Sequence, residues 1–137
     1  MTTFLEGFKK QVNSRPHSPA VSDTDRSLTY QRMWEEARRR SRDIPALAVH
    51  VVRGPRSVDL VVELLAAWTA GSVPILLSEQ VPEGRVEEIS RIVSGRGHLS
   101  TAEYLVSTSG STGKPKVVAM ETGSLVRTLE QQIVAFQ

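Results

Sequence analysis

The sequence predicts an α/β protein in which parallel strands alternate with helices in βαβ layers. Residues 46–52 and 73–77 are short apolar runs of the kind found in strands buried in a sheet. Residues 58–70 between them place apolar side chains at helical spacing. Parallel neighbours need a crossover connection of this length, so the three segments together predict one βαβ unit.

The first part of the chain predicts a helix, a hairpin and a second helix. Residues 3–13 carry apolar side chains at the spacing of an amphipathic helix. The polar turn Asp23-Thr24-Asp25 separates two short apolar pairs, which indicates a small β-hairpin. Thr29 is a suitable N-cap for a helix from about Tyr30 to Arg42.

That second helix carries the densest run of basic residues in the chain. Its charged members are Glu35, Glu36, Arg38, Arg39, Arg40 and Arg42. Acidic residues four positions before basic ones can pair along one helix face. We therefore expect a solvated helix face and not a binding site for an anionic polymer.

The remaining elements follow from caps, glycines and prolines. The basic turn Arg53–Ser57 ends the first strand of the βαβ unit, with Ser57 as N-cap of its helix and Gly71 as the stop. An amphipathic helix is expected over 82–93. A strand leading into a polar loop, a strand at Val117–Met120 and a final helix from about Ser124 complete the chain.

Composition limits the classes of function. The chain has 137 residues, the length of one domain, so residues 1–137 are expected to form a single domain piece. Apolar residues make up 39%, and the formal net charge is +2. This small charge gives no reason to expect nucleic acid or a membrane as partner. Cysteine is absent, and His17, His50 and His98 are far apart, so no metal site is predicted. The start lacks the apolar region of a signal peptide, and we expect a cytoplasmic protein.

The polar stretch at residues 108–116 is the candidate site. It consists only of Ser, Thr, Gly, Lys and Pro between two apolar runs. Such a loop concentrates backbone N–H groups, hydroxyls and positive charge in a small volume, which suits a phosphate chain. The predicted nucleotide-binding residues are Thr108, Ser109, Gly110, Ser111, Thr112, Gly113, Lys114 and Lys116.

Three other kinds of loop fit this stretch less well. A Walker A loop needs four residues between its glycines, but only Ser111 and Thr112 separate Gly110 from Gly113. A nucleophile elbow needs Gly-x-Ser-x-Gly, and the spacing here is one residue too short. A flexible Ser/Gly linker would seldom continue through Lys-Pro-Lys into an apolar strand.

The nine residues from Thr108 to Lys116 resemble the phosphate-loop signature of the adenylate-forming (AMP-binding) superfamily. This superfamily includes acyl-CoA synthetases, aryl-acid ligases and adenylation domains of nonribosomal peptide synthetases. Two earlier stretches are similar to its upstream motifs, in the right order. They are Leu28-Thr29-Tyr30 and the segment Leu65–Pro74, which contains Ala70-Gly71 and ends in Pro74.

The resemblance implies that the chain is the N-terminal subdomain, in truncated form, of a ligase that forms an acyl-adenylate. The cofactors would be ATP and Mg²⁺. The partners would be a small carboxylic acid and the thiol of CoA or of a carrier protein. Lys116 would act catalytically by neutralising charge on the leaving pyrophosphate. The motifs for the acyl pocket and the adenine contacts lie later in the family, so we expect this chain alone to be inactive.

A non-catalytic binding module is the alternative hypothesis. Val117 stands where the family usually has Gly, and Thr122 where many members have His. Such a module would keep the fold and bind phosphate weakly or not at all. It would also expose apolar surface, which favours a homo-oligomer or the rest of the enzyme as a separate chain.

Overall fold

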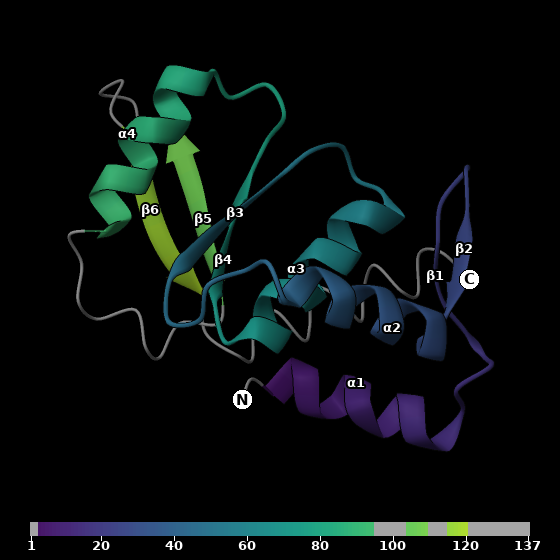
Figure 1. The fold of residues 1–137 in the computed structure, drawn as a ribbon. Helices are drawn as coiled ribbons and strands as arrows, with labels where there is room; N and C mark the ends of the chain where they lie inside the picture. The colour runs from purple at the N-terminus through teal and green to yellow at the C-terminus, as the bar shows by residue number, and fades with distance from the viewer. Residues whose placement is uncertain (1–2, 95–103, 110–114, 121–137) are drawn as a thin grey trace.

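The computed structural model describes residues 3–94, 104–109 and 115–120. Its elements, shown in Figure 1, are α1 (Thr3–Ser14), β1 (Pro19–Ser22), β2 (Ser27–Thr29), α2 (Tyr30–Ser41), β3 (Val49–Arg53), α3 (Val58–Ala70), β4 (Val73–Leu77), α4 (Glu83–Ser94), β5 (Tyr104–Ser109) and β6 (Pro115–Met120). The predicted α/β class and the β1–β2 hairpin are confirmed. The helix expected from Ser124 lies outside the described residues.

The central sheet has the strand order β3-β4-β5-β6. β4 is parallel to both β3 and β5, so α3 and α4 serve as the crossover helices that parallel neighbours require. β6 is antiparallel to β5, which makes the sheet mixed at that end. The parallel βαβ layers predicted from the sequence are therefore present, followed by one antiparallel hairpin.

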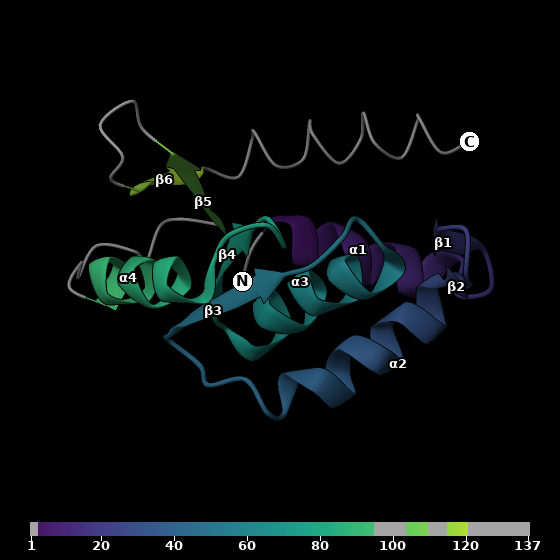
Figure 2. The same ribbon diagram turned by 90° about the horizontal axis from the view of Figure 1, so that it is seen from above.

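The two crossover helices cover opposite faces of the sheet. Val52 and Leu76 pack in the cluster that contains α3. Val51 and Ile75, each one residue earlier, pack instead with Ile89 of α4. Figure 2 shows β3 and β4 between the two helices. β3, β4 and β5 lie side by side in the sheet in the same order as in the sequence. Two crossover helices on opposite faces of such a sheet make connections of opposite hand. Only one of the two connections can therefore follow the usual right-handed rule.

Helix α3 forms the centre of the larger core. Val62, Leu65 and Ala66 have 0% exposed surface, and Trp68 has 4%. The sheet covers one side of α3, while α1 and α2 cover the other (Figure 1). The rings of Trp68 and Phe4 of α1 lie with centroids 4.9 Å apart, which fixes α1 against α3.

The predicted helix ends are confirmed. The Thr29 hydroxyl accepts a hydrogen bond from the N–H of Arg32 at 3.2 Å, and the Ser57 hydroxyl accepts one from the N–H of Leu60 at 3.3 Å. Gly71 ends α3 with a φ of 79°, in the left-handed region that glycine enters most easily.

The strand expected over 46–52 begins only at Val49. Leu47 has a φ of 58°, which interrupts an extended backbone, and its N–H donates to the carbonyl of Gly71 at 3.1 Å. Its side chain is 97% exposed. Leu47 is the only large apolar residue so exposed among those whose side chains the structure describes. The broad apolar exposure expected of a non-catalytic module is therefore not seen in that part of the chain.

The basic run of α2 is only partly a solvated face. Arg38 and Arg39 are exposed as predicted. Arg40 pairs weakly with Glu36, at 3.8 Å, but reaches across to α3, where it contacts Asp59 at 2.9 Å and Glu63 at 3.1 Å. Sequence spacing within one helix could not show these contacts, because both partners belong to another element.

The β1–β2 turn is tied to the start of α3 by one carboxylate. Asp23 accepts hydrogen bonds from the N–H groups of Val58 at 2.8 Å, Arg26 at 2.9 Å and Asp25 at 2.7 Å. These donors, with that of Val58 first, lower the pKa of the Asp23 carboxyl below its ordinary value. The charged form of Asp23 therefore stabilises the junction between the hairpin and α3.

Replacing Leu65 should destabilise the fold strongly, because this side chain is fully buried. We expect Leu65→Ala to lower the free energy of unfolding by about 2–5 kcal/mol, the range for such core truncations. Leu47→Ala removes the same atoms from an exposed site and should change the free energy of unfolding by less than about 0.5 kcal/mol. Chemical denaturation measures both, and equal effects would show that α3 is not the core helix.

The contribution of the Asp23 carboxylate to the free energy of unfolding should depend on pH. Because its pKa is lowered on folding, this contribution is fully present above the unfolded pKa of about 3.9 and is lost as the pH falls through the folded value. The stability difference between the wild-type chain and Asp23→Asn should therefore be larger at pH 7 than near pH 3. Urea denaturation at both pH values tests this, with the exposed Asp25→Asn as control. A difference independent of pH would contradict the assigned role of the charge.

Candidate functional site

The described part of the candidate site lies at the end of the β5–β6 pairing. Cα partners run in register from Tyr104 opposite Met120 to Ser109 opposite Pro115. Thr108 faces Lys116 across the hairpin, so the structure brings these two predicted site positions together in the backbone. The other predicted site residues lie outside the described residues, apart from Ser109 at the end of β5. They are Gly110, Ser111, Thr112, Gly113 and Lys114.

The strands extend further into the motif than the sequence predicts. β5 continues to Ser109, and β6 begins at Pro115 and not at Val117. Thr108 and Lys116 therefore lie in strands, where their backbones are held by the ladder, and not in a nine-residue loop. A hairpin of paired strands gives the turn between them a fixed base.

Val117 is compatible with the hairpin. It lies within β6 and pairs with Ser107, so its backbone belongs to an extended strand. β-branched residues are favoured in strands, whereas they are costly where φ is positive. The replacement of the usual glycine at this position is therefore no obstacle to the observed backbone. Thr122, the other departure from the family pattern, lies outside the described residues.

The described ends of the candidate site, Ser109 and Pro115, lie at the carboxyl ends of the parallel strands. β3 ends at Arg53, β4 at Leu77 and β5 at Ser109, and all three strands run in the same direction. Open α/β sheets bind their ligands beyond this edge, because loops from neighbouring strands meet there. The position of the candidate site in the fold thus agrees with a role in ligand binding.

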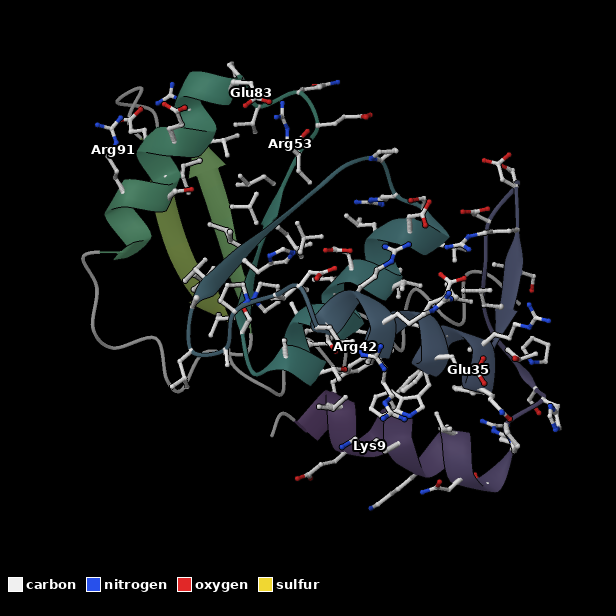
Figure 3. The ribbon with its side chains drawn as sticks, in the orientation of Figure 1. Lys9, Glu35, Arg42, Arg53, Glu83 and Arg91 are labelled. Atoms are coloured by element: carbon white, nitrogen blue, oxygen red, sulfur yellow. The ribbon has the colours of Figure 1, made fainter. Side chains whose placement is uncertain are left out.

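Arg53 organises the adjacent turn, residues 78–82, which joins β4 to α4. Its guanidinium donates to the carboxylate of Glu83 at 3.1 Å, to the backbone carbonyl of Glu79 at 3.1 Å and to that of Val81. Figure 3 shows Arg53 and Glu83 close together beyond the ends of β3 and β4. The sequence indicates Arg53 only as part of a basic turn. Its partners lie 26 to 30 residues away, so no local pattern could have indicated them.

The described residues add two further observations. Within residues 3–94, 104–109 and 115–120, no three His, Asp or Glu side chains gather as a group that could hold a metal ion. None of the helices in these ranges combines the length and the apolar character that a bilayer span requires.

The chain is similar to known proteins in sequence. No protein-family model matches it. It is 28% identical to the nonribosomal peptide synthetase kk1B of Curvularia clavata over 93% of its own length, but it spans only 1% of that relative.

The same similarity holds in structure. The N-terminal subdomain of Klebsiella oxytoca NpsA, solved with 3-hydroxybenzoyl-AMSN, has a TM-score of 0.67 and 21% identity, over 89% of this chain and 41% of NpsA. The O-succinylbenzoate coenzyme A synthetase of Bacillus subtilis, solved with AMP, has a TM-score of 0.66 and 14% identity, over 85% of this chain and 42% of the synthetase. The predicted resemblance to the N-terminal portion of adenylate-forming enzymes is confirmed.

The backbone at Val117 can be tested by two substitutions. In an extended strand, Val117→Gly should be less stable than Val117→Ala by roughly 0.5–1 kcal/mol, because glycine loses more conformational freedom on folding. If this position instead needed a positive φ, the glycine variant would be the more stable of the two. Denaturation midpoints of the two variants decide between these backbones.

Proposed function

We propose that this chain, whose sequence and fold are similar to the N-terminal portion of adenylate-forming enzymes, holds the polyphosphate tail of ATP during the formation of an acyl-adenylate. The observation that carries the proposal is the pairing of β5 with β6: β5 enters the Ser/Thr/Gly/Lys motif at Thr108 and Ser109, at the carboxyl end of the parallel strands, and β6 leaves it at Pro115 and Lys116. The hydroxyls, backbone N–H groups and lysines of this motif suit phosphate oxygens.

The proposed reaction joins a carboxylic acid to AMP. A carboxylate oxygen of the substrate attacks the α-phosphorus of ATP. The bond from this phosphorus to the oxygen that bridges the α- and β-phosphates breaks, and this oxygen leaves with the pyrophosphate. Negative charge then develops on the leaving pyrophosphate. Lys116, opposite Thr108 at the base of the hairpin, would stabilise that charge, and the N–H groups of the turn would keep the β- and γ-phosphates in place.

Mg²⁺ would accompany the nucleotide, because phosphate oxygens bind this cation readily and it neutralises part of their charge. Hydroxyls of the motif, such as those of Thr108 and Ser109, are suitable partners for the water molecules around the ion. This part of the proposal depends on the residue types of the motif.

The acyl group would then pass to a thiol. The similarity to a nonribosomal peptide synthetase supports a carrier-protein thiol as acceptor, while the similarity to a coenzyme A synthetase supports CoA. The acid, the acceptor and the adenine contacts would require further protein, in the same polypeptide or as a separate chain. We also propose a cytoplasmic location, where ATP and these thiols are found together.

Lys116→Ala should slow adenylate formation greatly while leaving the fold intact. We expect a decrease of about 10²–10³-fold, as for the loss of one group that stabilises transition-state charge. Carboxylate-dependent ATP–pyrophosphate exchange in the full-length protein measures this, and thermal unfolding serves as the test of folding. Lys114→Ala is the matched control and should cost less. Unchanged exchange per folded molecule in Lys116→Ala would contradict the proposed role.

A further inference from the structure

We propose that the exposed face of α2 is a docking surface for an acidic helix of a partner protein. Four arginines and one glutamate make up this basic face: Arg32, Glu35, Arg38, Arg39 and Arg42. All five side chains are exposed. The inference goes beyond the proposed function, because α2 packs against α1, α3 and the β1–β2 hairpin and contains no residue of the phosphate motif.

The basic face runs along the whole of α2. With roughly 100° of rotation per residue, its side chains lie within an arc of about 120° on one side of the helix. Arg42, the C-cap, keeps a helical backbone with a φ of −64° and a ψ of −27°. The helical rise places it about 15 Å along the axis from Arg32. Met33 and Ala37 bury the opposite side of the helix, and Figure 2 shows α2 on the outer side of α3.

The arginines of this face are unpaired within the described part of the chain. None of the four forms an ion pair there, whereas Arg26, Arg40 and Arg53 contact carboxylates at 2.7 to 3.1 Å. Glu35 could pair with an arginine three or four positions later, but its carboxylate instead accepts a hydrogen bond from the amide of Gln31 at 3.2 Å. Four positive charges and one negative charge therefore give the face a net charge of +3.

The helix dipole explains only part of this pattern. Positive charge near the end of a helix is favourable, which accounts for Arg38, Arg39 and Arg42. Arg32 lies in the first turn of α2, where the dipole disfavours a positive charge. Arg38 and Arg42, four positions apart, also repel each other across one turn. Solvation alone requires neither feature, whereas a partner that neutralises the charges accounts for both.

The charges of the basic face are complementary to those of an acidic helix. Arginine binds a carboxylate through two parallel hydrogen bonds and is enriched at protein interfaces. A helix presents side chains three or four positions apart on one side, so its carboxylates can meet the arginines along α2. Glu35 lies within the face, where it would repel phosphates but can pair with a lysine of a protein helix. The mixed charge therefore favours a protein over a nucleic acid or a membrane.

An aromatic side chain borders the basic face. Trp34 is half-buried and lies one turn before Arg38. The centroid of its ring is 6.3 Å from that of Phe8 in α1, and the Nζ atom of Lys9 lies 5.4 Å from the ring centroid, so both contacts hold the indole in place. Tryptophan and arginine are enriched among the residues that contribute most to interface affinity. The exposed part of the indole thus offers an apolar contact beside the charges.

Two synthetic helical peptides of the same composition test the proposal with the full-length protein. In the patterned peptide, glutamates and one lysine lie on one side of the helix to match the basic face. In the scrambled peptide, the same residues are distributed around the helix. Fluorescence anisotropy of the labelled peptides gives both affinities. We expect the patterned peptide to bind more tightly than the scrambled one, and its affinity to fall as the salt concentration rises.

Charge reversal tests the residues of the face. Arg39→Glu should weaken binding of the patterned peptide by about tenfold, because repulsion replaces attraction. Arg39→Gln, which removes only the attraction, should weaken it less. Patterned peptides with a single glutamate changed to lysine, tried at each position in turn, should include one that restores binding to Arg39→Glu. Arg56→Glu makes the same charge change on the exposed turn before α3 and should bind as the wild type does. Thermal unfolding shows whether each variant folds.

Four results would contradict the inference. The patterned peptide could fail to bind, or the two peptides could bind equally, which would show that only net charge matters. Equal losses in Arg39→Glu and Arg56→Glu would show a long-range effect of charge. Tighter binding of inorganic polyphosphate than of the patterned peptide, lost in Arg39→Glu, would make the face a site for anionic polymers. None of these results affects the proposed function, which is tested separately at Lys116.

Discussion

The burial of α3 is the constraint on which the rest of the structure depends. This helix is apolar on nearly all sides, and it can be buried only if the sheet covers one face while α1 and α2 cover the other. Its start is fixed by Ser57 and by the carboxylate of Asp23. Arg40 ties α2 to the first turns of α3 through Asp59 and Glu63. α3 thereby fixes the two strands that it joins.

The position of the candidate site follows from these fixed strands. β3 and β4 are covered by α3 on one face and by α4 on the other, and β5 joins the sheet beside β4. The β5–β6 hairpin then opens at the carboxyl edge of the parallel strands. Arg53, at the end of β3, arranges the turn after β4 at the same edge.

Local signals in the sequence predicted most of the fold and the position of the site. Caps, turn residues and periodicity depend on neighbouring residues, so the starts of α2 and α3, the stop at Gly71 and the β1–β2 hairpin could all be predicted. Contacts between distant elements could not. Arg40 was expected to pair within its own helix, and Arg53 was expected only to belong to a turn.

Leu47 shows a second kind of limit, because its apolar side chain suggested a buried strand. Its backbone is instead turned by the junction with Gly71, and its side chain faces outward. Hydrophobicity alone could not reveal this, since the cause is a hydrogen bond across 24 residues of sequence. The phosphate motif was identified by its residue types, and the structure adds the strands and the sheet edge that support it.

The most direct test of the central claim is a crystal structure of the full-length protein with a non-hydrolysable ATP analogue and Mg²⁺. We expect oxygens of the β- and γ-phosphates to lie about 2.7–3.2 Å from backbone nitrogens of residues 109–114, within hydrogen-bond distance. A polyphosphate tail bound elsewhere, with these N–H groups donating to neighbouring protein atoms, would contradict the account.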